Sequence, residues 1–271
     1  MALSAQDITV SFGTTPILKG VSLAARPGQV TAIIGPNGSG KTTLLRAITG
    51  EVAYDGDVLI NGKNARDARP EALARMRAVL PQATQLAFPF TVLEVVRLGL
   101  TAGVATGNPN DAGRLPSEAL SRVGLKGFEG RFYAELSGGE KQRVQLARVL
   151  VQIWLPVLDG VPRWLFLDEP VSSLDIAHQL MVMQIARDYA TGGGGVVAVM
   201  HDLNLTAMFA DHVTLMTQGT VAAAGTPAEV IRNDTLSAAY GCVISTQSAP
   251  SDGTPWLLPQ GARLAEQRAA E

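Results

Sequence analysis

A glycine-rich stretch near the N-terminus has the residue types and spacing of a loop that binds phosphate. It fits the pattern G-x-x-x-x-G-K-[ST] and consists of Gly35, Pro36, Asn37, Gly38, Ser39, Gly40, Lys41, Thr42 and Thr43. Glycines allow the backbone to approach phosphates without a Cβ in the way. The lysine of such a loop reaches the β- and γ-phosphates of a nucleotide, and the hydroxyl of Thr42 can bind Mg²⁺. The alternative is an ordinary glycine-rich turn with an incidental lysine.

The residues on either side of this loop predict the strand and the helix that a phosphate-binding loop needs. Residues 29–34 form a β-branched run typical of a buried strand, and residues 42–49 fit a helix closed by Gly50. Strand, loop and helix together place backbone N–H groups around an anion at the positive end of a helix dipole. This context favours nucleotide binding over an ordinary turn.

Two adjacent carboxylates follow an apolar run later in the chain. Residues 164–167 predict a central parallel strand, and Asp168 and Glu169 come directly after it. The end of such a strand lies at the carboxyl edge of the sheet, close to the phosphate loop. There Asp168 suits the water shell of Mg²⁺, and Glu169 can act as the base for an attacking water. The alternative is a strand end with two solvated acids.

A second candidate phosphate site is the sequence Leu-Ser-Gly-Gly-Glu at residues 136–140. Ser137 and Glu140 fit a helix capping box, which would explain them without any ligand. A plain cap does not require Gly138 and Gly139, because glycines cost backbone entropy near a helix start. Glycines with free amides at a helix N-terminus form an anion site. Two phosphate sites in one chain suggest a head-to-tail pair of subunits, with each nucleotide between them.

The order of strand-like and helix-like segments predicts an α/β fold with a mostly parallel sheet. Residues 7–12 and 17–23 read as two strands before the phosphate loop, with Phe12 at their turn as either a core aromatic or a platform for an adenine ring. Residues 227–240 read as one helix, and residues 255–259 as an edge strand.

The domain organisation follows from where the character of the sequence changes. Residues 83–160 are predicted to be a helical subdomain inserted into the main domain, which spans residues 1–245. Residues 246–271 carry little signal and are expected to form a C-terminal tail.

Composition excludes several classes of protein. The 271 residues carry a net charge of −2, which gives no basic face for nucleic acid. Cys242 is the single cysteine, so no intrachain disulfide is possible and a reducing cytosol is expected. We see no signal peptide, and the longest apolar runs, residues 149–158 and 195–200, are too short to cross a bilayer. Any link to a membrane must then run through a partner.

Taken together, these segments resemble the ATP-binding cassette (ABC) ATPases. Residues 35–43 match the Walker A motif of that family, residues 136–140 its signature and residues 164–170 its Walker B motif. The remaining family positions are occupied by Gln82 at the Q-loop, Asp175 at the D-loop, His201 at the switch position and Phe12 at the adenine-stacking position. The match spans residues 3–240, and the signature makes it specific. It implies a P-loop NTPase fold with an antiparallel N-terminal β subdomain.

The resemblance also implies ligands and residue roles. The ligands are ATP and Mg²⁺. The implied catalytic residues are Glu169, His201, Lys41 and Gln82. The implied Mg²⁺ contacts are Thr42, Gln82 and Asp168. The implied nucleotide contacts are Phe12, the nine residues of the phosphate loop, Ser137, Gly138, Gly139, Asp168 and Asp175. One departure is Val171, where the family usually has Thr or Ser, and it should cost a local hydrogen bond.

Several longer passages resemble one group within the family, the ATPase subunits of bacterial importers for iron chelates, cobalamin and haem. The resemblance is greatest to the haem importers, and it rests on residues 78–100, 146–154, 168–180 and 196–211 and on the insertion at 155–163. It implies a homodimer, two copies of a membrane permease, an indirect link to a periplasmic binding protein and a peripheral place on the cytoplasmic face of the inner membrane. The ATPase does not contact the cargo, so haem, siderophore and cobalamin all stay open.

Other functions share part of this pattern. A soluble ABC protein of DNA repair or translation has the same ATPase residues, but usually adds a coiled-coil arm or a second cassette. A nucleotide or sugar kinase has the phosphate loop and no use for the signature. An exporter subunit also stays open. His178 and His212 read as ordinary residues, because no second metal ligand stands at a suitable spacing.

Overall fold

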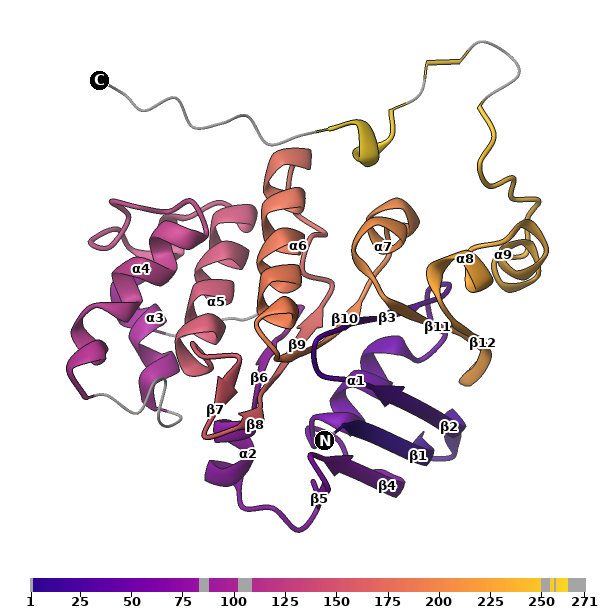
Figure 1. The fold of residues 1–271 in the computed structure, drawn as a ribbon, viewed down its shortest axis with the longest axis horizontal. Helices are drawn as coiled ribbons and strands as arrows, with labels where there is room; N and C mark the ends of the chain where they lie inside the picture. The colour runs from indigo at the N-terminus through magenta and orange to yellow at the C-terminus, as the bar shows by residue number, and fades with distance from the viewer. Residues whose placement is uncertain (1, 83–87, 102–108, 250–253, 256, 263–271) are drawn as a thin grey trace.

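The structure is a computed structural model that describes residues 2–82, 88–101, 109–249, 254–255 and 257–262. Its centre is a six-stranded sheet (Figure 1). Across the sheet the strands are β12 (Thr220–Gly225), β11 (His212–Thr217), β3 (Val30–Ile34), β10 (Gly195–Val199), β9 (Trp164–Asp168) and β6 (Arg77–Leu80). Neighbouring strands are parallel except β12, which pairs antiparallel with β11. The prediction of a mostly parallel α/β sheet is confirmed.

The central strands are apolar along their whole length because both faces of the sheet are covered. Every residue of β3, β9 and β10 is buried. Successive side chains of a strand point to opposite faces. In β9, Leu165 and Leu167 therefore belong to one hydrophobic core and Trp164 and Phe166 to the other. The sheet thus lies between two hydrophobic cores. The polar residues Asp168 and Glu169 lie at its carboxyl edge, at the end of β9.

A smaller antiparallel sheet covers one face of the central sheet, with helix α1 (Lys41–Ile48) packed between the two (Figure 1). Its strands are β2 (Thr15–Ala25), β1 (Leu3–Phe12), β4 (Asp55–Ile60) and β5 (Lys63–Asn64). Asn61 and Gly62 both have positive φ angles, 53° and 79°, as an Asn-Gly hairpin turn requires. Helix α2 (Pro70–Met76) then leads directly into β6.

Helices α6 (Ile176–Thr191) and α7 (Leu203–Phe209) cover the other face of the central sheet (Figure 1). A separate helical group lies at one side of the sheet and consists of α3 (Val92–Thr101), η1 (Pro109–Gly113), α4 (Leu115–Arg122), η2 (Tyr133–Glu135) and α5 (Gly138–Gln152). Helix α5 contacts both α3 and α4 and also reaches β6. It is therefore the element that joins the helical group to the central sheet.

The described part of the chain contains no helix with both the length and the apolar character needed to cross a membrane.

The insertion before β9 forms a hairpin of β7 (Val157–Leu158) and β8 (Val161–Pro162). The amide of Asn61 ties the hairpin to the N-terminal sheet by donating to the carbonyl of Pro162 at 2.8 Å.

Two sequence-based expectations near the C-terminus are wrong. Residues 227–240 form two helices, α8 (Pro227–Val230) and α9 (Asn233–Tyr240), because the backbone is extended at Arg232 (φ −126°, ψ 154°). The edge strand expected at residues 255–259 is absent from the described residues there, which lead into a short η3 helix (Pro259–Gly261). Two prolines remove two backbone donors from this stretch, which disfavours a ladder.

Candidate functional site

The phosphate loop joins the end of β3 to the start of α1, as its sequence predicts. Gly35 has φ +143°, and a Cβ placed there would lie 2.1 Å from the carbonyl oxygen of Met216 on β11. Gly40 is the N-cap of α1 with φ +99°, in the left-handed region that glycine tolerates. The loop therefore needs glycine at its entrance for space and at its exit for backbone conformation.

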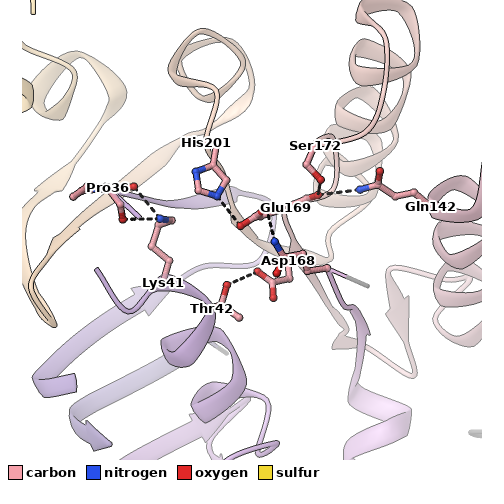
Figure 2. Close-up of polar contacts among 10 residues, drawn as sticks. Pro36, Lys41, Thr42, Gln142, Asp168, Glu169, Ser172 and His201 are labelled. Carbon is pink, nitrogen blue, oxygen red and sulfur yellow. Dashed lines mark hydrogen bonds and ion pairs between the residues drawn. The ribbon is translucent and has the colours of Figure 1, made fainter. Parts of the chain in front are cut away.

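Lys41 folds back over this loop (Figure 2). Its Nζ donates to the carbonyl oxygens of Gly35 at 2.9 Å and Pro36 at 3.0 Å. Burial lowers the pKa of the Lys41 ammonium, and the nearby carboxylates of Glu169 and Asp168 oppose that shift. Two of the three N–H donors are used by the loop, so the third can serve a phosphate oxygen.

Thr42 and Asp168 form the polar pair at the base of the site (Figure 2). The Thr42 hydroxyl donates to Oδ1 of Asp168 at 2.9 Å. Asp168 ends β9, and its residue surface is only 2% exposed. Burial raises the pKa of the Asp168 carboxyl, and the hydrogen bond from Thr42 opposes the shift. A hydroxyl and a carboxylate in contact are hard oxygen donors that suit Mg²⁺ together with substrate phosphates.

The Glu169 carboxylate is held from two sides. Oε1 lies 2.6 Å from Nε2 of His201, and Oε2 accepts a hydrogen bond from the Gln82 amide at 2.9 Å. Gln82 and His201 follow β6 and β10, the two strands that flank β9. The sheet order thus brings together three residues that lie far apart in the sequence.

These residues line one open hollow of about 810 Å³. Its walls are Phe12, Ile17, Asn37, Gly38, Gly40, Lys41, Thr42, Thr43, Gln82, Glu169, Ser172 and His201. Phe12 is 57% exposed, so its core alternative is wrong. An exposed aromatic ring in the wall of this hollow is a suitable surface for a purine ring.

The signature residues lie elsewhere, in a second hollow of about 420 Å³. Its walls are Ser137, Gly138, Gly139, Glu140, Arg143, Ser173, Leu174, Asp175 and His178. The capping box is present, because Oγ of Ser137 accepts from the Glu140 N–H and Oε2 of Glu140 accepts from the Ser137 N–H. Asp175 caps α6 by accepting from the His178 N–H at 2.9 Å. The residues of the phosphate loop and those of the signature therefore line two separate hollows of the same chain.

The structure adds residues that the sequence did not single out. Ile17 and Ser172 line the first hollow. Gln142 on α5 donates to the backbone carbonyl of Glu169 at 2.9 Å. Tyr240, at the end of α9, lies close to the backbone of Gly35, and burial raises the pKa of its phenol. Ser172 lies two residues after the Walker B motif, so its place in the sequence could have indicated it. No spacing rule connects Gln142 or Tyr240 to the residues that they contact.

Val171 and His178 both have contacts within the protein. Val171 is 6% exposed and packs in the core, so an apolar side chain suits its position. Nδ1 of His178 lies 2.8 Å from Oδ1 of Asp175. Within the described ranges, no group of three or more His, Cys, Asp and Glu residues is arranged to hold a metal ion.

Known proteins are similar in sequence to this chain over almost its whole length. A protein of Jannaschia sp. named hemin import ATP-binding protein HmuV is 62% identical over 263 residues, which cover 96% of this chain and 95% of the relative. A protein of the same name from Roseobacter denitrificans is 59% identical and covers 97% of this chain and 99% of the relative.

Solved structures agree with this result. An ATP-binding cassette of an ABC transporter in its ADP conformation superposes with a TM-score of 0.74 at 25% identity and covers 89% of this chain and 98% of that one. The cbiO1 protein of Clostridium perfringens, part of the ABC transporter complex cbiONQ, gives a TM-score of 0.70 at 27% identity, with coverage of 86% and 91%. Residues 18–172 match the ABC transporter family. This chain therefore belongs to the ABC transporter ATP-binding family, and it is an ATPase with the P-loop NTPase fold.

Proposed function

We propose that this chain is the ATP-hydrolysing subunit of a bacterial ABC importer and that it energises the uptake of haem through a separate membrane permease. The observation that carries the haem assignment is the identity of 62% and 59% to two proteins named for hemin import, over at least 95% of either chain. Ferric siderophore and cobalamin are the other cargoes to test, since the ATPase site itself does not contact the cargo.

The first hollow is proposed to hold ATP. Phe12 would stack on the adenine, and the nine loop residues from Gly35 to Thr43 would surround the phosphates with N–H groups. Lys41 would add a positive charge at the β- and γ-phosphates through the N–H donor that the loop carbonyls do not use. Binding and positioning supply most of the catalysis in phosphoryl transfer.

Mg²⁺ fits the oxygen donors next to this loop. Thr42 and Asp168, in contact at 2.9 Å, would hold the ion, with the Gln82 side chain as a further oxygen donor. When bound, the ion neutralises charge on the β- and γ-phosphate oxygens.

Glu169 is proposed as the general base that takes a proton from the attacking water. Its carboxylate faces the hollow between Gln82 and His201, so its orientation is set before the substrate binds. His201 would in turn contact the γ-phosphate, and Gln82 would report the state of the site to the permease. These three side chains and Lys41 form the proposed catalytic group.

A homodimer would complete the site. The signature residues Ser137, Gly138 and Gly139 lie in a hollow separate from the phosphate loop of the same chain. We propose that they bind the γ-phosphate of the ATP held by a second copy, with Asp175 linking the two sites. Loss of phosphate after hydrolysis would remove the charge that joins the subunits, and the dimer would reopen.

The domain boundaries complete the proposal. Residues 1–245 would form the ATPase domain, residues 83–160 its helical subdomain and residues 246–271 a tail. The assembly would contain two copies of this chain and two copies of the permease, and it would lie on the cytoplasmic face of the inner membrane. A periplasmic binding protein would act through the permease.

The exposed aromatic ring of Phe88, which is 71% accessible, offers an apolar anchor for that permease.

Co-purification with the permease, followed by uptake into proteoliposomes, tests this function. ATP-dependent uptake would be compared for haem, a ferric siderophore and cobalamin. We expect accumulation of haem alone. Uptake of only one of the other two cargoes would contradict the haem assignment, and failure to bind any permease would contradict the importer.

A further inference from the structure

The backbone of Glu169 adopts a conformation that needs support from its surroundings. Its φ angle is +51°, in the left-handed region where a side chain with a Cβ is disfavoured. Residues in such conformations persist only where neighbouring groups hold them, and they occur often at functional sites. The contacts of the Glu169 peptide groups therefore show what keeps this carboxylate in place.

The shortest hydrogen bond to the backbone carbonyl of Glu169 comes from a side chain on helix α5 (Figure 2). The Glu169 N–H donates to the Val199 carbonyl at 3.2 Å. The Glu169 carbonyl accepts from Nε2 of Gln142 at 2.9 Å. Ser172 donates to the same oxygen with its hydroxyl at 3.3 Å and its N–H at 3.4 Å, both longer contacts. Gln142 is thus the close donor to this oxygen.

The other end of the Gln142 amide shows that the contact has a cost. Nε2 of Gln142 must face the Glu169 carbonyl, because the amide oxygen and the carbonyl oxygen are both acceptors and neither carries a hydrogen to donate. Oε1 of Gln142 is then buried and has no hydrogen-bond partner within the described part of the chain. A buried acceptor without a partner destabilises the fold.

Gln142 also belongs to the helix that begins with the signature residues. It is the fifth residue of α5, which starts at Gly138. A Cβ on Gly139 would lie 3.1 Å from the carbonyl oxygen of Ser173, so the helix start packs closely against the segment that follows Glu169. The contact between Gln142 and Glu169 therefore joins the helical group to the carboxyl edge of the central sheet.

We propose that Gln142 is a positioning residue for ATP hydrolysis, whose amide reaches from the signature helix to hold the Glu169 backbone so that its carboxylate faces the nucleotide hollow. The inference rests on the proposed role of Glu169 as the base. Without this donor, the backbone would relax toward the extended conformation preferred before a proline, here Pro170. The carboxylate would then leave its place between Gln82 and His201. Movement of α5 would act on Glu169 through the same contact.

Three variants of the full-length protein test this role. Gln142→Met keeps the length of the side chain and removes the donor, and Gln142→Lys puts an N–H donor back at similar reach. The matched control is Gln152→Met, at the other end of α5. Gln152 also uses its amide on backbone carbonyls, donating to Ala74 and Arg77 at 2.9 Å each, and it lies outside the nucleotide hollow.

The expected result is a split between kcat and KM for ATP. In Gln142→Met, kcat should fall about tenfold, a fraction of what a general base contributes, while KM stays within about twofold because ground-state binding is unaffected. Gln142→Lys should return kcat to within about threefold of the unsubstituted protein. Gln152→Met should keep kcat within about twofold, although its Tm should fall at least as far as that of Gln142→Met.

The outcomes separate this inference from the proposed function. An unchanged kcat in Gln142→Met, an equal loss in Gln152→Met, or no recovery in Gln142→Lys would overturn the role of Gln142 while Glu169→Gln stays slow. Normal hydrolysis by Glu169→Gln would instead remove Glu169 as the base, and the role of Gln142 with it.

Discussion

The Nε2 atom of His201 lies 2.6 Å from Oε1 of Glu169. The second carboxylate oxygen of Glu169 is occupied by the amide of Gln82. The three residues follow three adjacent parallel strands, β10, β9 and β6. A carboxylate fixed by partners on both sides needs little reorganisation when substrate arrives, which favours catalysis by preorganised groups.

Replacing Glu169 by Gln should slow ATP hydrolysis by about a hundredfold or more, since a positioned general base contributes on that order. The amide has nearly the same size as the carboxylate, so ATP binding should stay intact. Single-turnover hydrolysis and equilibrium binding of ATP measure the two effects separately. A dimer that persists in ATP should be visible by size-exclusion chromatography, and a normal rate of hydrolysis would exclude Glu169 as the base.

Replacing Phe88 by Ala should weaken binding to the permease by about 2 kcal/mol, as expected for loss of an aromatic anchor. Phe88 is 71% exposed and meets Phe90 edge-on, with ring centroids 6.1 Å apart. Phe90 is partly buried against the core, so a Phe88/Phe90 double variant should also lose stability. Basal hydrolysis should not change in Phe88→Ala.

The matched control for this surface is Leu257→Ala, because Leu257 is 68% exposed on the C-terminal segment. It should leave the affinity for the permease unchanged. A pull-down with equal recovery of permease by the unsubstituted protein and by Phe88→Ala would contradict an anchor at Phe88.

Replacing Gly35 by Ala should destabilise the phosphate loop. The new Cβ would lie 2.1 Å from the Met216 carbonyl, and φ is +143°. Steric overlap and backbone strain together should lower the free energy of unfolding by about 3 kcal/mol. Gly28→Ala is the control, because Gly28 has φ +82° with nothing within 4 Å of the added Cβ, and it should cost about 1 kcal/mol from strain alone. Denaturant unfolding of the two variants measures the difference, and equal losses would show that contact with Met216 does not matter.

The capping box of α5 should make stability depend on pH through Glu140. The backbone N–H of Ser137 donates to the Glu140 carboxylate and holds its pKa below the ordinary value of 4.5. A lowered pKa in the folded state stabilises the protein above the pKa of the unfolded chain, and that stability is lost as pH falls through the folded-state pKa. The Tm advantage of the unsubstituted protein over Glu140→Gln should therefore be full at pH 7, begin to fall as the pH drops through about 4.5, and vanish only below the lowered pKa of the folded protein.

Glu229→Gln is the matched variant for this experiment. Glu229 closes the capping box of α8, and its pKa is lowered by the Thr226 backbone N–H in the same way. It should show the same trend with pH. A Tm difference for Glu140→Gln that does not change between pH 7 and acid would contradict the role of the charged cap.

Much of the fold could be predicted from local sequence because local chemistry decides it. The uninterrupted apolar runs of β3, β9 and β10 follow from burial on both faces. The hairpin between β11 and β12 follows from Gly219, which tolerates its φ of +81°. The exact first and last residues of the helices were less predictable from the sequence. For example, the phosphate-loop helix expected at residues 42–49 spans Lys41–Ile48, one residue earlier at both ends.

The sequence by itself determined the chemistry of this protein: the phosphate loop, the carboxylates after β9 and the signature residues are local motifs with fixed spacing. Only the tertiary structure decided which of them meet. Strand order places Gln82 and His201 on either side of Glu169, while the signature glycines lie in a separate hollow. The contact of Gln142 with the Glu169 carbonyl depends on how α5 packs against the sheet edge. Such long-range packing follows from the whole core, and no local pattern encodes it.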